Sequence, residues 1–313
     1  MTDADLTPPA DLTPPVGYVA RHLTLDDAQA VTDLVAATEL DVDGAVEIDV
    51  TDVRGDWDRP SFDLATMSVG VERDGRLVAF GETFAGRGEV EVQPSERGHG
   101  LGTALMRWIW RVARAQGHDE VGQIVSDRHA TAVALFRANG YAAGRSSWIL
   151  RIDLDEQVPA PVLPEGFAIR EFQEGADDRA AFEVITTAFA EWKGRLDAFE
   201  DWRASVLRHP AVLPSVTPVV VHDGRVVGVA IGMDYGEAAG EGWVQQLAVE
   251  RAFRGRGLGR ALLVESFGRF RALGYGRAGL STDSRTGALG LYEHVGMRVD
   301  RSYTYWAKRL DGD

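Results

Sequence analysis

Cysteine is absent from this sequence of 313 residues. Its absence excludes disulfide bonds, metal sites built on thiolates and catalysis by a cysteine nucleophile. Lysine is scarce as well, because Lys193 and Lys308 are the only two and nearly all other basic side chains are arginine. We attribute this scarcity to a coding bias rather than to a function.

An excess of positive charge is also missing. Asp and Glu number 48 against 33 Lys and Arg, which gives a net charge of −15 and a pI of about 4.9. This balance argues against nucleic acid and anionic membrane surfaces as partners, because phosphate groups need a basic surface.

No apolar run approaches the ~20 residues that a membrane helix needs. The N-terminus carries Asp where a signal peptide has a basic region, and no apolar signal core follows. We therefore expect a cytoplasmic protein that does not bind a membrane. The seven histidines show no metal-ligand spacing, so no metal is expected.

The sequence does contain an internal repeat. Two predicted strands flank Asp74-Gly75, and two more flank Asp223-Gly224, 149 residues later. Each hairpin is followed by a strand, a glycine-rich turn and a helix. The chain is long enough for two domains, and its 45% hydrophobic residues suffice for two cores. We conclude that two α/β domains of the same topology follow one another.

The domain boundaries follow from composition. Residues 1–15 repeat a proline-rich pentapeptide with few apolar groups, and we expect a disordered or extended tail. The N-terminal domain is then 16–154 and the C-terminal domain 166–313. The linker between them, 155–165, carries three prolines.

Some individual elements are predicted as well. Short helices are expected near 52–58 and over 197–208. The strands at 148–153 and 302–309 are expected to close the first and the second domain. Trp108 and Trp110 lie on a predicted helix and are interpreted as core or interface residues.

The second glycine-rich turn, at 254–259, lies between a strand and a helix. Its glycines let backbone N–H groups crowd toward one point, and the helix N-terminus adds unpaired N–H groups and positive dipole charge. This arrangement suits a phosphate, although such a turn can also be a mere connection. The first copy, at 97–102, has the same setting, and this repetition favours a phosphate site.

The pattern Arg-x-x-Gly-x-Gly after a short strand resembles motif A of the GNAT superfamily of acyl-CoA-dependent N-acyltransferases. The segment Leu291-Tyr-Glu-His-Val-Gly-Met297 resembles a second motif of that family. The resemblance covers nearly the whole chain, twice. It implies that each domain is a mixed, mostly antiparallel sheet flanked by helices. It also implies acetyl-CoA, or another short acyl-CoA, as co-substrate.

By this resemblance, two sets of residues bind the coenzyme. The fourth strand of each domain contributes the backbone of Leu247, Ala248 and Val249, and that of Val90 and Val92. The pyrophosphate is held by the glycine turns, namely Arg254, Gly255, Arg256, Gly257, Gly259 and Arg260 in the second domain and Arg97, Gly98, His99, Gly100, Gly102 and Thr103 in the first. Arg285, and His129 in the first domain, replace an Asn of the family, and Arg285 is predicted to reach a phosphate.

The two domains differ at the residue that the resemblance assigns as general acid. The family's tyrosine near the sulfur matches Tyr292, which as general acid would protonate the leaving thiolate. The corresponding residue of the first domain is Phe136, which has no proton to give. We expect the C-terminal domain to be the catalyst, unless Tyr292 only packs. The N-terminal domain would then bind acyl-CoA without turnover or be structural.

The general base is predicted to be Glu241 or a water. In the first domain Glu82, Glu89 and Glu91 are interpreted as a solvated acidic face, and alternatively as a site for a cationic amine.

The acceptor pocket is expected at Trp192, Trp202 and Asp234, which would bind substrate or merely pack. We expect direct acetyl transfer to a primary amine of a small molecule, by a monomer or homodimer. The alternatives are a protein N-terminus or lysine as acceptor, and a non-catalytic acyl-CoA-binding or regulatory protein.

Overall fold

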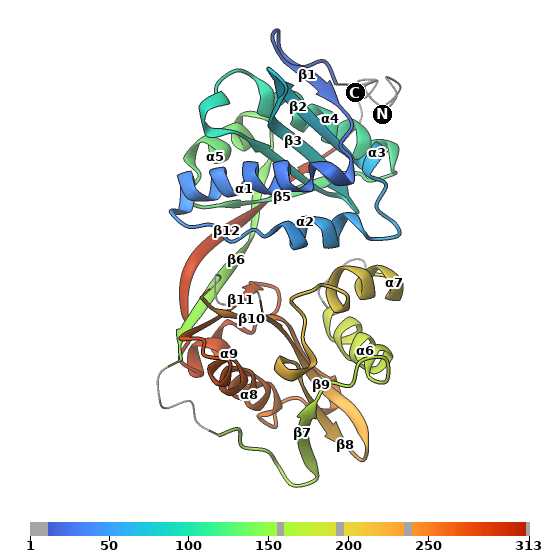
Figure 1. The fold of residues 1–313 in the computed structure, drawn as a ribbon, viewed down its shortest axis with the longest axis vertical. Helices are drawn as coiled ribbons and strands as arrows, with labels where there is room; N and C mark the ends of the chain where they lie inside the picture. Colours follow the sequence, from blue (N-terminus) through green and yellow to red (C-terminus); the bar gives the residue numbers. More distant parts are fainter. Residues whose placement is uncertain (1–11, 155–159, 192–196, 235–239, 311–313) are drawn as a thin grey trace. The chain divides into compact units, whose positions relative to one another are not determined.

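The computed structural model describes residues 12–154, 160–191, 197–234 and 240–310. They form two compact units (Figure 1). Unit 1 comprises residues up to Ser146 together with Tyr303 onward, and unit 2 comprises Ser147–Ser302. Each unit is an α/β domain with a mixed, mostly antiparallel sheet, as the sequence predicts.

The sheet of unit 1 has the order β1-β2-β3-β4-β5-β12. Neighbouring strands are antiparallel except β4 and β5, which are parallel. Its strands are β1 (Val19–Arg21), β2 (Ser68–Arg73), β3 (Arg76–Phe84), β4 (Arg87–Val92), β5 (Glu120–Ser126) and the latter part of β12 (Arg298–Arg309). Its helices are α1 (Ala28–Asp43), α2 (Val50–Trp57), α3 (Leu64–Met67), α4 (Leu101–Ala115) and α5 (Ala130–Ala138).

Alternation along β3 sends side chains to two separate cores. Phe80 packs in one cluster with Leu34 of α1 and Trp57 of α2. Ala79 packs in the other cluster with Leu105 of α4. The helices α1 and α2 therefore cover one face of the sheet and α4 the opposite face.

The sheet of unit 2 has the order β6-β11-β10-β9-β8-β7 and repeats this arrangement. Its strands are β6 (Ala142–Asp153, which begins in unit 1), β7 (Phe167–Glu171), β8 (Pro218–His222), β9 (Arg225–Asp234), β10 (Gly242–Val249) and β11 (Arg277–Asp283). Its helices are α6 (Asp178–Phe189), α7 (Phe199–Trp202), α8 (Leu258–Ala272) and α9 (Leu289–His294). A π-helical turn, Arg203–Leu207, extends α7 toward the predicted end.

The predicted Asp-Gly hairpins are confirmed. Asp74 and Gly75 have φ of 51° and 72°, and Asp223 and Gly224 have φ of 49° and 76°. Two consecutive residues with positive φ match the twist of the flanking strands, which explains why the same dipeptide recurs.

The closing strands differ from the sequence expectation. Residues 147–153 pair with β11 in unit 2, from Ser147 opposite Asp283 to Asp153 opposite Arg277. Residues 303–309 pair with β5 in unit 1. Each repeat thus supplies the last strand of the other unit. Because the two units have the same topology, β5 and β11 present equivalent edges, and sequence alone did not show which strand occupies which edge.

The tail is ordered from residue 12 in the part that the structure describes. Leu12, expected to lie in a disordered or extended tail, is only 6% exposed and belongs to the core of unit 1. Pro15 lies near Gly100 of the first glycine turn. The proline doublet permits an extended segment, and a single buried leucine anchors it.

The strand exchange predicts where a core mutation acts. Trp306 of β12 is buried in the core of unit 1, and Leu150 of β6 in that of unit 2. We expect Trp306→Ala to lower the free energy of unfolding by about 3–5 kcal/mol and Leu150→Ala by about 2–5 kcal/mol. Hydrogen exchange should then rise in β5 for Trp306→Ala and in β11 for Leu150→Ala. The reverse pattern would contradict the exchange.

Candidate active site

Both glycine turns adopt a conformation that favours glycine. Gly255 and Gly257 have φ of 75° and 81°, and Gly98 and Gly100 have φ of 84° and 86°. Gly257 and Gly100 are the N-cap residues of α8 and α4, and no described side chain caps either helix. The N–H groups of each first turn are therefore left for a ligand at the positive end of the helix dipole.

The third glycine of each turn serves helix packing. A Cβ on Gly102 would lie 2.9 Å from Leu135 of α5, and one on Gly259 would lie 3.5 Å from Leu291 of α9. Close approach of two helices therefore favours glycine in unit 1, where the end of the Leu135 side chain would have to move, while a Cβ in unit 2 would make an ordinary contact. These contacts hold the phosphate turn against the helix that carries Phe136 or Tyr292.

The first arginine of each turn binds protein groups. Arg254 donates from Nε to the carbonyl of Val249 at 3.0 Å and from Nη1 to the Glu191 carboxylate at 2.8 Å. Arg97 makes the corresponding ion pair with Asp41 of α1. These contacts fasten each turn to the first long helix of its unit, which favours a positioning role over direct phosphate contact.

The other predicted coenzyme side chains of unit 2 lie in different surroundings. The guanidinium of Arg256 lies 5.7 Å from the ring centroid of Phe253. Arg285 is paired with the carboxylate of Asp283 through Nε and Nη2. Arg260 is exposed on the first turn of α8. The predicted phosphate contact therefore rests on Arg260 and the backbone more than on Arg285.

In unit 1 the corresponding side chains are partly used by the protein. The Nδ1 atom of His99 lies 3.1 Å from the carbonyl oxygen of Glu96. His129 caps α5 by accepting from the N–H of Ala132 at 3.3 Å, and burial lowers its pKa. Thr103 lies in the first turn of α4.

The fourth strand of each unit separates from its parallel neighbour. β10 pairs with β11 from Gly242 to Val244, and a bulge then inserts one residue between Val244 and Gln246. β4 is paired with β5 at Arg87 opposite Gly122, and it runs beside β3 without a register shift. Beyond these points, in the described residues, the backbone of Leu247–Val249 and of Val90–Val92 pairs with a strand on one side. The other side is the place where the resemblance puts the pantetheine arm.

Tyr292 lies beside this separation. It is 7% exposed on α9 and is hydrogen-bonded to the side chain of Thr282. Thr282 lies on β11, two residues beyond Leu280, the last residue that pairs with β10. Burial raises the pKa of Tyr292 to about 12, although the hydrogen bond with Thr282 opposes the rise. The phenol is thus fully protonated at neutral pH.

In unit 1 the position equivalent to Tyr292 is occupied by the apolar side chain of Phe136. Phe136 is 5% exposed, and its ring centroid lies 4.9 Å from that of Tyr141 and 5.9 Å from that of Trp306. The hydroxyl of Tyr141 accepts hydrogen bonds from Trp110 and Gln123 at 2.8 and 2.9 Å. The hydroxyl in this cluster, that of Tyr141, is thus held by two protein donors, and Phe136 itself carries none.

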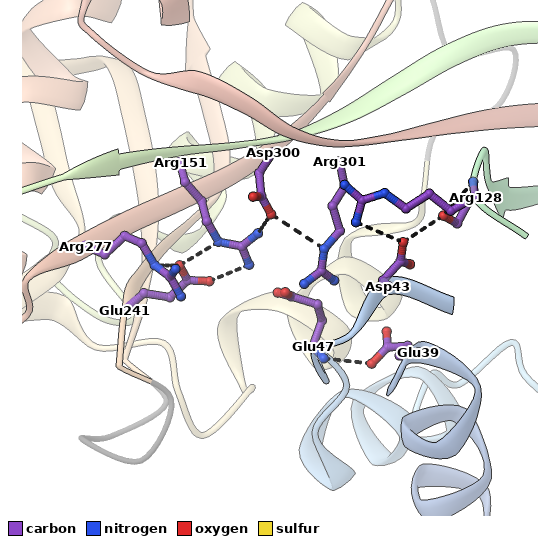
Figure 2. A network of polar contacts seen from close by, with 10 residues as sticks. Glu39, Asp43, Glu47, Arg128, Arg151, Glu241, Arg277, Asp300 and Arg301 are labelled. Atoms are coloured by element: carbon purple, nitrogen blue, oxygen red, sulfur yellow. Dashed lines mark hydrogen bonds and ion pairs between the residues drawn. The ribbon is translucent and has the colours of Figure 1, made fainter. Parts of the chain in front are cut away.

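Glu241 is held by two guanidinium groups (Figure 2). Arg151 donates to both carboxylate oxygens at 2.9 Å, and Arg277 lies 2.9 Å from Oε2. Arg151 also pairs with Asp300. Because its oxygens are engaged and the side chain is 10% exposed, the geometry disfavours Glu241 as a base that takes a proton from an amine. It instead fixes the exchanged strand β6 to β10.

The predicted acceptor residues have separate outcomes. Trp202 is 2% exposed in the core beneath α6, and its indole N–H donates to Gln246 Oε1 at 2.9 Å. Asp234 accepts from the hydroxyl of Tyr275. Trp192 lies outside the described residues. Trp202 therefore acts on the site through Gln246.

The three carboxylates of unit 1 share one face. Glu82 and Glu89 are directly opposite each other on β3 and β4, and Trp57 of α2 donates to Glu82 at 3.0 Å. Burial and the facing carboxylate of Glu89 hold the pKa of Glu82 well above its usual range. Burial raises the pKa of Glu91 to about 7. Glu89 is exposed, whereas Glu82 and Glu91 are half-buried. The predicted solvated acidic face therefore describes Glu89 but not the other two carboxylates.

Three further observations concern core packing, metal ligands and membrane helices. Trp108 is buried in the core of unit 1, as predicted. Within the described ranges, no three His, Asp or Glu side chains gather as metal ligands would. None of the described helices combines the length and apolar character of a membrane span.

Thr282 was missed by the sequence argument. The available signal was a polar residue at an inward position of a strand, since Ala278, Leu280 and Thr282 alternate toward the same face. The ion-pair partners of the turn arginines, Asp41 and Glu191, carried no comparable signal.

The chain matches the model of the acetyltransferase (GNAT) family over residues 35–141 and again over 179–297. It is 28% identical to a mycothiol acetyltransferase of Nocardia farcinica, across 90% of this chain and 95% of that protein. It is 31% identical to the mycothiol acetyltransferase of Nocardiopsis dassonvillei, across 76% and 81%.

Two solved structures resemble both units together. A GCN5-related N-acetyltransferase from Sphaerobacter thermophilus has a TM-score of 0.75 and 32% identity, and the match covers 95% of this chain and 97% of that one. A tandem GNAT protein from the clavulanic acid biosynthesis pathway has a TM-score of 0.70 at 17% identity, covering 95% and 99%, and shows the shared fold.

The ion pairs of Glu241 predict a structural penalty. We expect Glu241→Gln to lower the free energy of unfolding by about 3 kcal/mol, because it leaves the buried charge of Arg151 undercompensated. Chemical denaturation measures the change, and Glu265→Gln, at an i,i+4 pair with Arg269, should cost only about 0.2–0.5 kcal/mol. A stable Glu241→Gln protein with lost turnover would instead support a base.

The raised pKa of Glu82 predicts a pH-dependent mutation effect. A carboxyl group whose pKa is higher in the folded protein destabilises the fold as pH rises from its unfolded value of about 4.3. We expect Glu82→Gln to raise the melting temperature at pH 8 and to change it little at pH 4. The exposed Glu120→Gln serves as control, and an equal effect at both pH values would contradict the burial of charge.

Proposed function

The chain belongs to the acetyltransferase (GNAT) family and is an N-acetyltransferase, and we propose that unit 2 transfers an acetyl group from acetyl-CoA to a primary amine of a small molecule. Unit 1 keeps the fold and the glycine turn without the proton donor. The observation that carries this assignment is the pair Tyr292 and Phe136, which occupy equivalent positions with different chemistry.

The geometry of unit 2 suits binding of the donor. The unpaired N–H groups at the start of α8 suit the pyrophosphate of a coenzyme A ester. The open side of Leu247–Val249 suits the amides of its pantetheine arm, as an added strand would. Backbone N–H groups near the bulge are suited to stabilise the oxyanion that forms at the thioester carbonyl.

Tyr292 then acts at the leaving group. The neutral amine forms a bond to the carbonyl carbon, and the resulting intermediate loses the carbon–sulfur bond. The sulfur leaves with the electron pair and takes a proton from Tyr292. The ammonium proton of the product passes to water or back to the phenolate, so that the balance is amide and free thiol.

Thr282 prepares the phenol for this role. The hydrogen bond between the two side chains lowers the pKa of Tyr292 and holds its hydroxyl beside β11. A pKa of about 12 keeps the phenol proton on Tyr292 until a thiolate forms nearby.

A small-molecule acceptor is supported by the relatives. Several proteins that align over most of this chain are named mycothiol acetyltransferase, which identifies a small molecule as the compound acetylated or formed. We carry over the class of acceptor and not the particular compound. The role of general base is assigned to water, since Glu241 is engaged by two arginines.

The substitution Tyr292→Phe, which removes only the phenol oxygen, tests the assignment of Tyr292 as general acid. We expect Tyr292→Phe to lower kcat about 10²- to 10⁴-fold without weakening acetyl-CoA binding, because only the proton donor is lost. Thiol release is measured with acetyl-CoA and a panel of amino sugars, amino acids, simple amines and peptides. Turnover restricted to peptides would identify a protein acetyltransferase instead.

Phe136→Tyr provides the matched control in unit 1. It adds the same oxygen at the equivalent position and should leave kcat unchanged. A fall in kcat for Phe136→Tyr, with no effect of Tyr292→Phe, would place catalysis in unit 1.

A further inference from the structure

The bulge in β10 brings two carboxamides to the same face. Trp243 lies opposite Met233 and Gln246 opposite Ile231 on β9, and Gln245 is the inserted residue between them. Ile231 and Ala248 pack with α6, whereas Val244 and Leu247 pack with α8. Gln246 therefore faces the α6 side.

Gln245 shares that side with Trp243, which it contacts. A Cβ on Gly279 of β11 would meet Trp243, and the neighbours of Gly279, Ala278 and Leu280, face α8. Trp243 thus lies on the α6 side of the sheet, and Gln245 with it.

Each carboxamide is oriented by a tryptophan. The indole N–H of Trp202 donates to Gln246 Oε1 at 2.9 Å, and that of Trp243 donates to Gln245 Oε1 at 3.0 Å. An indole nitrogen only donates, so the oxygen of each amide must face the ring and the NH₂ group must turn away. The orientation of both amides is therefore fixed by the indole N–H groups, which can only donate.

The NH₂ groups of Gln245 and Gln246 are available to a ligand at the point where β10 stops pairing with β11. Among the described residues, no hydrogen bond of either amide nitrogen is found. Gln245 is exposed and Gln246 half-buried, so both can be reached. They lie beside the backbone of Leu247, which the proposed function places at the thioester.

Unit 1 shows the opposite chemistry at equivalent positions. Glu82 is paired with Glu89 there, where unit 2 pairs Ile231 with Gln246. Trp57 donates to Glu82 as Trp202 donates to Gln246. The same backbone therefore presents acceptors in unit 1 and donors in unit 2.

We propose that Gln245 and Gln246 select an amine acceptor that carries an oxygen, as hydroxyl or carboxylate, near the reacting nitrogen. This inference rests on the proposed function, and it names the substrate class of that site. The amide N–H groups donate to this oxygen and hold the amine at the thioester. Trp202 and Trp243 are positioning residues, because they touch the amides rather than the acceptor.

Paired amines test the proposal with the full-length enzyme. Glucosamine and cyclohexylamine differ in their oxygens, and L-phenylalanine and 2-phenylethylamine differ in one carboxylate. We expect kcat/KM to be about 10- to 30-fold higher for at least one oxygenated member over its partner, as two hydrogen bonds imply. The pair that responds distinguishes hydroxyl from carboxylate.

Substitutions then assign the preference to the amides. Gln246→Glu still accepts from Trp202 but turns an anionic oxygen toward the ligand, and should abolish or reverse a preference for a carboxylate. A hydroxyl can donate to that oxygen, so Gln246→Leu, which removes the amide, is the variant that should abolish a preference for a hydroxyl. Trp202→Phe keeps most of the packing and frees the amide, and should raise the acceptor KM about 3- to 10-fold with the acetyl-CoA KM unchanged. Trp57→Phe in unit 1 is the matched control and should change neither constant.

Each outcome decides one claim. Equal rates within both amine pairs, or a preference that survives in Gln246→Glu and Gln246→Leu, would overturn the selection by Gln245 and Gln246. Absence of thiol release with every amine of the wider panel would overturn the proposed function itself. A preference lost in Gln246→Leu, with the acetyl-CoA KM intact, supports both.

Discussion

The separation of β10 from β11 after Val244 is the constraint on which the candidate site depends. A strand that leaves its neighbour exposes backbone donors and acceptors, which need a partner. The bulge at Gln245 bends β10 and accompanies the separation. Next to this point lie the uncapped start of α8 and the amides of Gln245 and Gln246, whose N–H groups have no partner among the described residues. The hydroxyl of Tyr292 lies nearby and is hydrogen-bonded to Thr282. A ligand with phosphates, amides and a thioester satisfies groups that the protein leaves open.

Comparison of the two units distinguishes site features that come from the backbone from those that come from side chains. Both units have the positive-φ glycines, the uncapped helix and the early end of parallel pairing. They differ in the residues placed on this frame, with Phe136 for Tyr292 and Glu89 for Gln246. The shared backbone is therefore suited to a coenzyme in both units, while the proposed turnover depends on side chains that, among the described residues, unit 2 combines and unit 1 does not.

Sequence reasoning succeeded where the signal is local. The Asp-Gly hairpins and the strand–turn–helix order at the glycine turns are set by short segments. The contrast of Tyr292 with Phe136 is also local, and its catalytic meaning stays a prediction. It did not give the strand exchange, because β6 and β12 fit equivalent edges and the choice depends on long-range contacts such as Arg151 with Glu241. It also assigned Arg254 to phosphate, since charge pairing with Glu191 across 63 residues leaves no trace in the pattern.

Two observations bear on how the acceptor loses its proton. Two arginines bind Glu241, and the residues of β10 that face the α6 side are uncharged. The residues on β10 that face this side are Trp243, Gln245, Gln246 and Ala248, and none of them is a base. An amine that binds there as a cation gains no carboxylate partner from β10, whereas a neutral amine with a neighbouring oxygen finds amide donors. For an acceptor bound as proposed, the β10 residues thus favour the nucleophilic form of the amine, which is consistent with water as the base. In unit 1 the same face carries Glu82, Glu89 and Glu91, and those of them that are charged would instead favour the cation, which cannot attack a thioester.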